Sequence, residues 1–278
     1  MTSLPESTET PQREAELRMT AHRLQLPRST NPQDILAMVR NVRPEAELSD
    51  GVLDLGEGAR LVQDTDPRRG GRWSIEVPRV REDPLPAGMT DSHGYAAAFP
   101  DGMPFGVERE VLDLCWSLGR RLFGAVVTDS GVRLEPHPHQ VRDLIVVSPH
   151  RVDNVSLAEL LANIEKEISV VGSPEKTAPR YALTVPLGDD EIQVRVGERS
   201  RPVALREQRW IATSSDYEIV HVTADPEEDA IAAPDAATQA RWAEAYARIG
   251  RIAAVLVENV GGYVIDREGF LVAPSDLA

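Results

Sequence analysis

The sequence contains a single cysteine, Cys115, among its 278 residues. One thiol excludes an internal disulfide framework and any zinc site built from several cysteines. Aromatic residues are also scarce, at 5% of the chain, which leaves too few rings for a platform on which nucleic-acid bases stack. Cys115 lies between Leu114 and Trp116 in a segment with helical spacing, so we expect it to be a buried core residue rather than a reactive thiol.

Positive charge is in short supply, because 45 acidic residues outnumber 30 basic ones and leave a formal net charge of −15. This balance argues against nucleic acid or an anionic membrane as the partner, since phosphate groups do not attract an acidic protein. Lysine occurs only as Lys166 and Lys176, so almost every basic residue is arginine. That preference is typical of proteins encoded by GC-rich bacterial genomes.

Long apolar runs are missing as well. The longest, residues 252–257, has six residues, whereas a helix needs about 20 to span a bilayer. The first ten residues are polar and acidic, without the basic and apolar regions of a secretory signal. We therefore expect a cytoplasmic protein without membrane contacts. Its length suits one large domain or two ordinary ones.

The apolar spacing predicts a mixture of helices and strands. Helices are predicted over about 32–41, 107–122 and 236–260, and a further helix is predicted to begin near Ser156. Alternating or short apolar segments predict strands at the following positions: 52–55, 73–77, 95–99, 125–128, 132–134, 144–147, 181–187, 192–196, 218–222, 263–265 and 270–272. This pattern indicates an α+β fold.

A short repeat links the two halves of the chain. Segment 124–136 resembles segment 261–274 when one extra residue is allowed in the second turn. Identical residues then pair at five positions: Gly124 with Gly261, Val127 with Val264, Asp129 with Asp266, Gly131 with Gly269 and Pro136 with Pro274. We interpret this repeat as an internal duplication that produced two tandem related lobes of the split β-α-β, or ferredoxin-like, type.

Turn chemistry accounts for the repeated residues without a ligand. The first glycine ends a helix at positive φ, and the proline stops an edge strand. Asp129 and Asp266 each precede a glycine by two or three residues, Gly131 and Gly269, as in tight turns, so we interpret them as structural rather than as a catalytic pair.

The repeat also suggests boundaries for the parts of the chain. The predicted order is a flexible tail over 1–30, an α+β repeat over 31–152, a helical connector over 153–178 and a second α+β repeat over 179–278.

One motif has a catalytic interpretation. His221, Val222 and Thr223 close a predicted strand and resemble the H-x-[ST] element of the two-lobed 2H phosphoesterases. That resemblance implies a hydrolase in which one imidazole from each lobe acts as general acid or base on a phosphodiester, with His221 and Thr223 as candidates here. The other histidines do not supply the second motif that such an enzyme requires.

A second candidate site is a proline-rich loop with several histidines. His137 and His139 flank Pro138, so both rings can point the same way in an extended segment, with Asp143 and His150 as further metal ligands. An exposed loop with incidental histidines is the interpretation we favour, because two histidines alone do not make a zinc site. We predict no metal and no cofactor.

The last predicted helix carries an apolar stripe that holds for about five turns, formed by Trp242, Tyr246, Ile249, Leu256 and Val260. Packing against the protein's own sheet is the interpretation we favour. The spacing also suits contact with a helix of a partner or of a second copy of the chain.

Three functions remain open at this stage. The preferred one is a non-enzymatic protein-interaction or regulatory module, acting on a protein partner or as a homodimer, because no complete catalytic motif is present. The alternatives are a phosphoester hydrolase that uses His221, and a small-molecule or metal-binding module that uses loop 137–150.

Overall fold

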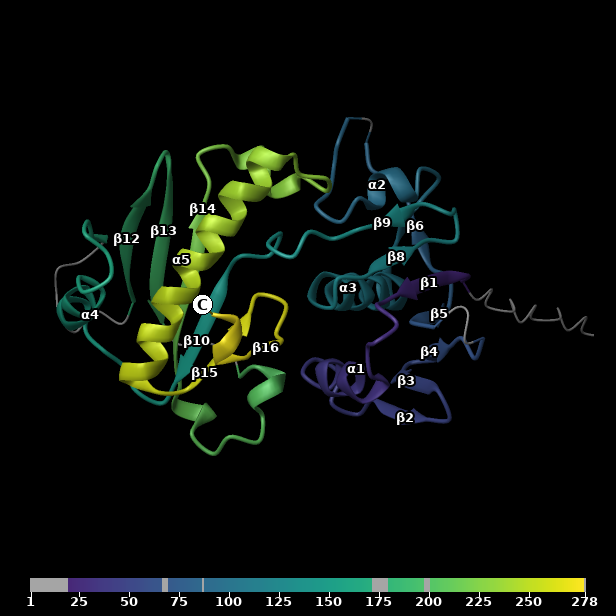
Figure 1. The fold of residues 1–278 in the computed structure, drawn as a ribbon, viewed down its shortest axis with the longest axis horizontal. Coiled ribbons are helices and arrows are strands. Elements are labelled where there is room, and N and C mark those ends of the chain that lie inside the picture. The colour runs from purple at the N-terminus through teal and green to yellow at the C-terminus, as the bar shows by residue number, and fades with distance from the viewer. Residues whose placement is uncertain (1–19, 67–69, 87, 172–179, 198–200, 278) are drawn as a thin grey trace, which may run out of the picture.

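The computed structural model describes residues 20–66, 70–86, 88–171, 180–197 and 201–277. It contains two lobes, each built on a seven-stranded sheet whose neighbouring strands are antiparallel (Figure 1). A few helices accompany the sheets, so the fold is α+β, as the apolar spacing predicted.

The first lobe holds the sheet with the order β2-β3-β4-β5-β1-β8-β9. Its elements are β1 (His22–Gln25), α1 (Pro32–Val39), β2 (Glu47–Ser49), β3 (Val52–Gly56), β4 (Ala59–Gln63), β5 (Arg72–Glu76), α2 (Tyr95–Ala98), α3 (Gly106–Arg121), β8 (Ala125–Val127) and β9 (Arg133–Leu134). A separate two-stranded sheet pairs β6 (Arg81–Glu82) with β7 (Met103–Pro104).

The second lobe holds the sheet with the order β11-β12-β13-β14-β10-β15-β16. Its elements are β10 (Leu144–Ser148), α4 (Asn154–Leu161), β11 (Ser169–Val171), β12 (Tyr181–Leu187), β13 (Asp190–Gly197), β14 (Ser215–Val222), α5 (Ala236–Val260), β15 (Tyr263–Asp266) and β16 (Leu271–Val272). Short 3-10 helices lie at Val203–Leu205, Ile211–Thr213, Pro226–Ala230 and Pro274–Asp276.

The two sheets are connected in the same order. In each lobe the first strand, β1 or β10, lies inside the sheet and is followed by a helix and four strands, the last of which returns to pair with the first. A long helix, α3 or α5, then leads to two strands on the other side of that first strand.

The final strand pairs of the two lobes match with a constant offset of 138 residues. Thr128 N donates to Val132 O, and Asp266 N donates to Phe270 O, each over 2.9 Å. Asp266 therefore occupies the place of Thr128, not of Asp129 as the sequence comparison assumed, and the second turn has no extra residue. The sequence alignment placed the two aspartates opposite each other because they are identical. In the folded protein, strand pairing decides which residues are equivalent.

The glycines confirm this offset. A Cβ on Gly124 would lie 2.3 Å from Gln25 O in β1, and a Cβ on Gly262 would lie 2.1 Å from Val147 O in β10. Gly262 is thus the equivalent of Gly124. Gly124 is required by this close approach rather than by positive φ, which in the first lobe occurs at Phe123, with φ of 55°.

Some described elements fall outside their predicted places. Residues 22–25, within the predicted tail, form β1, and residues 1–19 lie outside the described part. Residues 144–148, assigned to the first repeat, form β10 of the second sheet. Within the predicted connector, α4 packs against the second core, and Asp153 rather than Ser156 is its N-cap.

Segment 95–99 is the clearest error in secondary structure, because a strand was predicted and a short helix, α2, is found. The Asp91 carboxylate accepts hydrogen bonds from the backbone N–H groups of Tyr95 and Ala96, at 2.9 and 2.6 Å. An aspartate that caps free N–H groups starts a helical turn, and this local signal outweighs the apolar character of the segment.

The apolar stripe of α5 is buried inside the second lobe. Ile249, Leu256 and Val260 belong to the core between α5 and the sheet, Trp242 is also buried, and Tyr246 packs at the edge of that core. The stripe is therefore not a surface for a partner, and the packing interpretation is the correct one.

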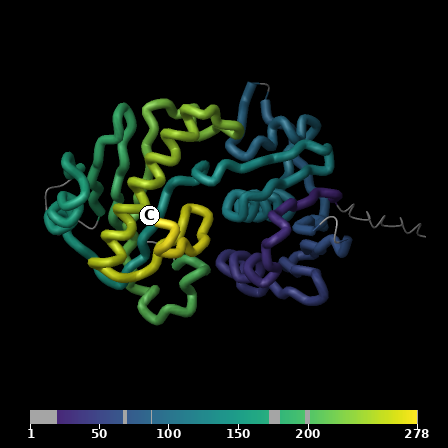
Figure 2. Tube along the Cα trace, viewed as in Figure 1, coloured from purple at the N-terminus to yellow at the C-terminus, as the bar shows by residue number. Residues whose placement is uncertain are grey.

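The two lobes are held together by the turn between β15 and β16. Phe270 in this turn belongs to the apolar core of the first lobe, where it is 3% exposed. Asp266 and Glu268 pair with Arg120 at 2.8 and 2.6 Å, and Asp266 also pairs with Arg121. The yellow C-terminal turn accordingly lies beside α3 (Figure 2).

Among the helices of the described residues, none combines the length and the hydropathy needed to cross a bilayer.

Candidate functional site

A cleft with a volume of about 980 Å³ lies between the two lobes. Its first-lobe wall is formed by residues from α3, the segment after α1 and the segment before α2, including His93, Glu110, Asp113 and Trp116. Its second-lobe wall comes from the segment entering β10, the end of β14, the 3-10 helix Pro226–Ala230 and the turn after β15, including Arg142, Asp143, His221, Asp229 and Arg267. Both lobes are therefore needed to form the site.

His93 occupies the first-lobe wall. Its ring stacks on Tyr95 at 5.1 Å between centroids and lies 4.4 Å from the ring of Trp116. Nδ1 is 3.2 Å from Ser92 Oγ, whereas Nε2 is 3.9 Å from Asp113 Oδ1, too far for a hydrogen bond. Burial lowers the pKa of His93 although Asp113 opposes the shift, so the imidazole is neutral at pH 7 and Nε2 is open to a ligand.

Trp116 lies beneath His93 and is only 2% exposed, although it lines the cleft. Its indole N–H has no hydrogen-bond partner among the described residues. A buried tryptophan normally finds an acceptor for this donor, and the Trp116 nitrogen is not among the fully buried polar atoms that lack a partner, so it keeps some exposure and a ligand or a water molecule can accept from it.

Asp113 is fixed by its neighbours in the same wall. Its Oδ1 accepts hydrogen bonds from the Tyr95 hydroxyl at 3.0 Å and from Arg109 Nε at 2.9 Å. Burial, with Asp113 close by, raises the pKa of Tyr95 well above its ordinary value, so Tyr95 remains a donor throughout the physiological range. Asp113 is thus already neutralised by Arg109.

His221 reaches the opposite wall, but both of its ring nitrogens are occupied. Arg142 Nε donates to Nδ1 at 2.8 Å, so Nε2 carries the proton and lies 3.0 Å from Asp190 Oδ2. Burial and the Arg142 charge lower the pKa of His221. An imidazole tied on both sides cannot exchange a proton with a substrate unless one of these contacts breaks.

Arg142 is the centre of the second-lobe wall. Besides His221, it contacts Asp229 Oδ1 at 3.0 Å, and its guanidinium lies 4.7 Å from the centroid of the Trp242 ring. Asp229 is 65% exposed at its side chain, so its carboxylate remains accessible from the cleft.

Asp143 and Arg267 form the loosest ion pair of the cleft. Asp143 Oδ1 accepts from the His221 backbone N–H at 3.1 Å, and Oδ2 is 3.6 Å from Arg267 Nη1. Burial raises the pKa of Asp143 against the opposing effect of that hydrogen bond and of Arg267. The Arg267 side chain is 75% exposed, which leaves most of its donors available to a ligand.

The histidine loop does not bring its four candidate ligands together. His137 and His139 lie near each other, with ring centroids 5.6 Å apart, but they pack against Trp242 and Tyr246 of α5. Asp143 precedes β10 and His150 follows it, so the strand separates these two candidates. Within the described residues, no group of three or more histidine, cysteine or acidic side chains is placed to hold an ion.

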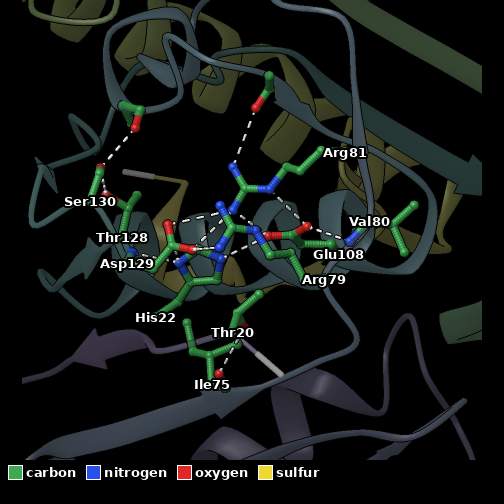
Figure 3. A network of polar contacts seen from close by, with 12 residues as sticks. Thr20, His22, Ile75, Arg79, Val80, Arg81, Glu108, Thr128, Asp129 and Ser130 are labelled. Carbon is green, nitrogen blue, oxygen red and sulfur yellow. Dashed lines mark hydrogen bonds and ion pairs between the residues drawn. The ribbon is translucent and has the colours of Figure 1, made fainter. Parts of the chain in front are cut away.

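A second polar network is buried in the first lobe around His22 (Figure 3). Its Nε2 is 3.0 Å from Glu108 Oε1, and its Nδ1 accepts from the Asp129 backbone N–H at 2.8 Å. Arg81 Nη2 lies 2.7 Å from Glu108 and 3.2 Å from Asp129. His22 is fully buried and does not line the cleft between the lobes, so this network stabilises the lobe.

The catalytic candidates are therefore dispersed. His221 lines the cleft, Asp129 belongs to the His22 network, and Asp266 belongs to the ion pairs that join the lobes. The Thr223 hydroxyl donates to Asp225 O at 2.9 Å in an exposed turn. Cys115 is buried, and burial raises the pKa of its thiol, which makes it unreactive as predicted.

Sequence reasoning missed His93, Trp116, Arg142 and Arg267 as site residues, because no motif joins positions so far apart in the chain. The only available signal was the loop 137–150, whose residues 140–143 line the cleft. Comparisons with protein-family models, curated proteins and solved structures gave no match to this chain.

Proposed function

We propose that this protein is a non-enzymatic binding module that holds a small polar ligand in the cleft between its lobes. The observation that carries the proposal is a pair of polar groups in the first-lobe wall that make no hydrogen bond within the described residues, His93 Nε2 and the Trp116 N–H. The cleft volume of about 980 Å³ lies in the range of small-molecule sites, which runs from about 300 to 1,000 Å³.

Hydrolysis of phosphoesters has weaker support. The cleft does have one imidazole from each lobe, His93 and His221, but His221 would have to leave Arg142 and Asp190 before it could act. The lining carboxylates, such as Glu110 and Asp229, would also repel a phosphodiester. Binding without chemistry is therefore the simpler proposal.

A protein partner and a cytoplasmic location remain predictions from the sequence. The α5 stripe, for which contact with a partner was the alternative interpretation, is buried, so the proposal now rests on the cleft rather than on a helix surface. Loop 137–150 keeps a role, since Gln140 joins the lobes by donating to Ser92 O and, at 3.0 Å, to Ile231 O.

We also propose that the two lobes arose by duplication of a ferredoxin-like unit. Two observations support this origin: the common order of connections and the constant 138-residue offset between the final strand pairs. The order β8-β1-β5-β4 in one sheet and β15-β10-β14-β13 in the other is the order expected of a split β-α-β unit.

The binding proposal is tested with a thermal-shift screen of amino acids, short peptides, polyamines, nucleotides and sugars. A ligand at 100 times its Kd stabilises the protein by about 2.7 kcal/mol and raises Tm by roughly 5 °C. We expect at least one class to raise the Tm of the wild type and of His150→Ala, a matched control outside the cleft lining. For His93→Ala, we expect the same rise in Tm to require a ligand concentration at least tenfold higher.

The Tm of each ligand-free variant shows that it is folded before the response is compared. The proposal is overturned if no class shifts the wild type, or if folded His93→Ala responds in the same way as His150→Ala.

A further inference from the structure

The cleft also indicates the kind of ligand. We infer that it binds a zwitterion, a molecule with an ammonium group at one end and a carboxylate at the other, as in an amino acid or a short peptide with free termini. This inference rests on the proposed binding function and deepens it by naming the ligand class. It follows from the pairing of charges on the two walls.

The charges of the cleft are balanced one by one. Glu110 pairs with Arg43 at 2.8 Å, Asp229 with Arg142 at 3.0 Å and Asp143 with Arg267 at 3.6 Å. The two remaining lining carboxylates pair with arginines that do not line the cleft, Asp113 with Arg109 and Glu268 with Arg120. His93 and His221 are neutral because burial lowers the pKa of each.

This balance selects against an ion of a single sign. Since each lining acid already has an arginine partner, a bare anion or a bare cation leaves the cleft with an excess charge. A zwitterion can place its carboxylate beside Arg267 and its ammonium beside Asp229 and add no net charge.

The groups with spare capacity match the two ends of such a ligand. Arg267 is 75% exposed and held only by the 3.6 Å pair among the described residues, so its guanidinium can bind a carboxylate. Asp229 is 65% exposed and uses Oδ1 for Arg142, so its carboxylate can accept an ammonium. Both residues line the cleft from the second lobe.

The first-lobe wall suits the middle of the ligand. The Trp116 N–H and His93 Nε2 are polar groups without a protein hydrogen bond, and a peptide carbonyl or amide can satisfy them. Leu114, Val141 and Phe270 line the same cleft and provide apolar surface for a side chain. A volume of about 980 Å³ exceeds the needs of one amino acid, which favours a short peptide as the source.

The test is calorimetric titration of the full chain with four forms of Ala-Leu-Ala: free at both ends, acetylated, amidated, and blocked at both ends. Free leucine serves as the arm for a single amino acid. We expect the free tripeptide to bind most tightly, each blocked end to weaken binding about tenfold, and the doubly blocked peptide to bind weakest.

Variants assign each end of the ligand to its partner. Arg267→Gln should weaken binding of the free peptide. It should also abolish the difference in affinity between peptides with a free and an amidated carboxyl end. Asp229→Asn should abolish the difference between free and acetylated amino ends. Arg251→Gln and Glu227→Gln change the same charges on exposed side chains outside the cleft lining, and they should behave as wild type.

The inference is overturned if blocked peptides bind as well as free ones, or if a nucleotide or a polyamine binds more tightly than the free tripeptide. In either case a Tm shift that depends on His93 still supports the cleft as the binding site. A protein that responds to no class at all overturns the proposed function itself, so the two failures are distinguishable.

Discussion

The turn between β8 and β9 and the turn between β15 and β16 have the same backbone but different roles. In both, the first residue donates to the fifth over 2.9 Å, and the glycine at the fourth position donates back to the first. In the first lobe, Asp129 contacts His22 and Arg81 of its own lobe. In the second lobe, Asp266 and Phe270 leave their lobe and pack into the other.

This difference shows that side chains, and not the turn geometry, decide whether a turn closes its own lobe or joins two lobes. Val132 and Phe270 occupy equivalent positions, and both pack against the core of the first lobe. The larger ring of Phe270 reaches a lobe to which its strands do not belong. This contact, together with the ion pairs of Asp266 and Glu268 and the bonds of Gln140, holds the lobes on either side of the cleft.

The largest expected effect is that of Phe270→Ala. Removing a buried ring leaves a cavity in the first core and should lower the free energy of unfolding by about 3–5 kcal/mol. Val132→Ala, on a half-buried side chain, should cost about 1 kcal/mol. Urea unfolding of both variants measures the comparison, and equal losses would contradict the special role of the second turn.

Next in size is the effect of Asp266→Asn, because Asp266 is 3% exposed and pairs with two arginines of the other lobe. Leaving Arg120 and Arg121 without this carboxylate should cost about 3 kcal/mol. Asp129→Asn, on a more accessible side chain, should cost about 1 kcal/mol. Small-angle scattering should show separation of the lobes in the first variant, and a compact Asp266→Asn protein would contradict this account.

The glycines sharpen the comparison by testing the 138-residue offset. Gly124→Ala and Gly262→Ala each force a Cβ against a strand carbonyl and should cost about 2–3 kcal/mol. A Cβ on Gly261 meets open space, but the residue has φ of 67° and ψ of −173°, a region essentially confined to glycine, so Gly261→Ala should cost about 1–3 kcal/mol through its backbone alone. Urea unfolding measures these losses, and an unchanged stability of Gly124→Ala or Gly262→Ala would contradict the close approaches that set the offset.

The smallest expected effect is a dependence of stability on pH near the contact of the lobes. Burial lowers the pKa of His93, His137, His139 and His221, so the unfolded chain binds more protons just below pH 6.5 than the folded one does. Stability is therefore complete above pH 6.5 and falls as the pH drops through the lowered values.

Urea unfolding at pH 7.5 and 5.5 measures this loss. The double variant His137→Asn with His139→Asn should lose less stability over the same interval than the wild type does. Asp143→Asn serves as the control for the opposite shift, because the raised pKa of Asp143 stabilises the folded state as the pH falls. An unchanged pH dependence in the double variant would exclude these two histidines as its source.

Most of the secondary structure could be predicted from the sequence, because apolar periodicity is a local signal. The helices α3 and α5 and the hairpin β12–β13 appear within a few residues of their predicted positions. Segment 95–99 was missed because Asp91 lies outside the apolar run that it caps. The strand β1 was missed because four residues with alternating burial are a weak signal.

The site could hardly be predicted, because its residues come from both lobes and share no spacing. His221 was singled out by its motif, but Asp190 and Arg142, which immobilise it, lie 31 and 79 residues away. His93 was not predicted as a site residue. It becomes a candidate only through its contact with the Trp116 ring and because its Nε2 makes no hydrogen bond within the described residues. Pairing partners and open donors are properties of the folded chain alone.

The position of Phe270 has a consequence for synthesis of the protein on the ribosome. Among the buried residues of the first core, Phe270 is made last, and the one before it is Leu134. At about 5–20 residues per second, the 136 residues from Glu135 to Phe270 take roughly 7–27 s. During that interval the core of the first lobe lacks the Phe270 side chain. Until Phe270 is made, the first lobe is therefore exposed to chaperones and proteases with an incomplete core.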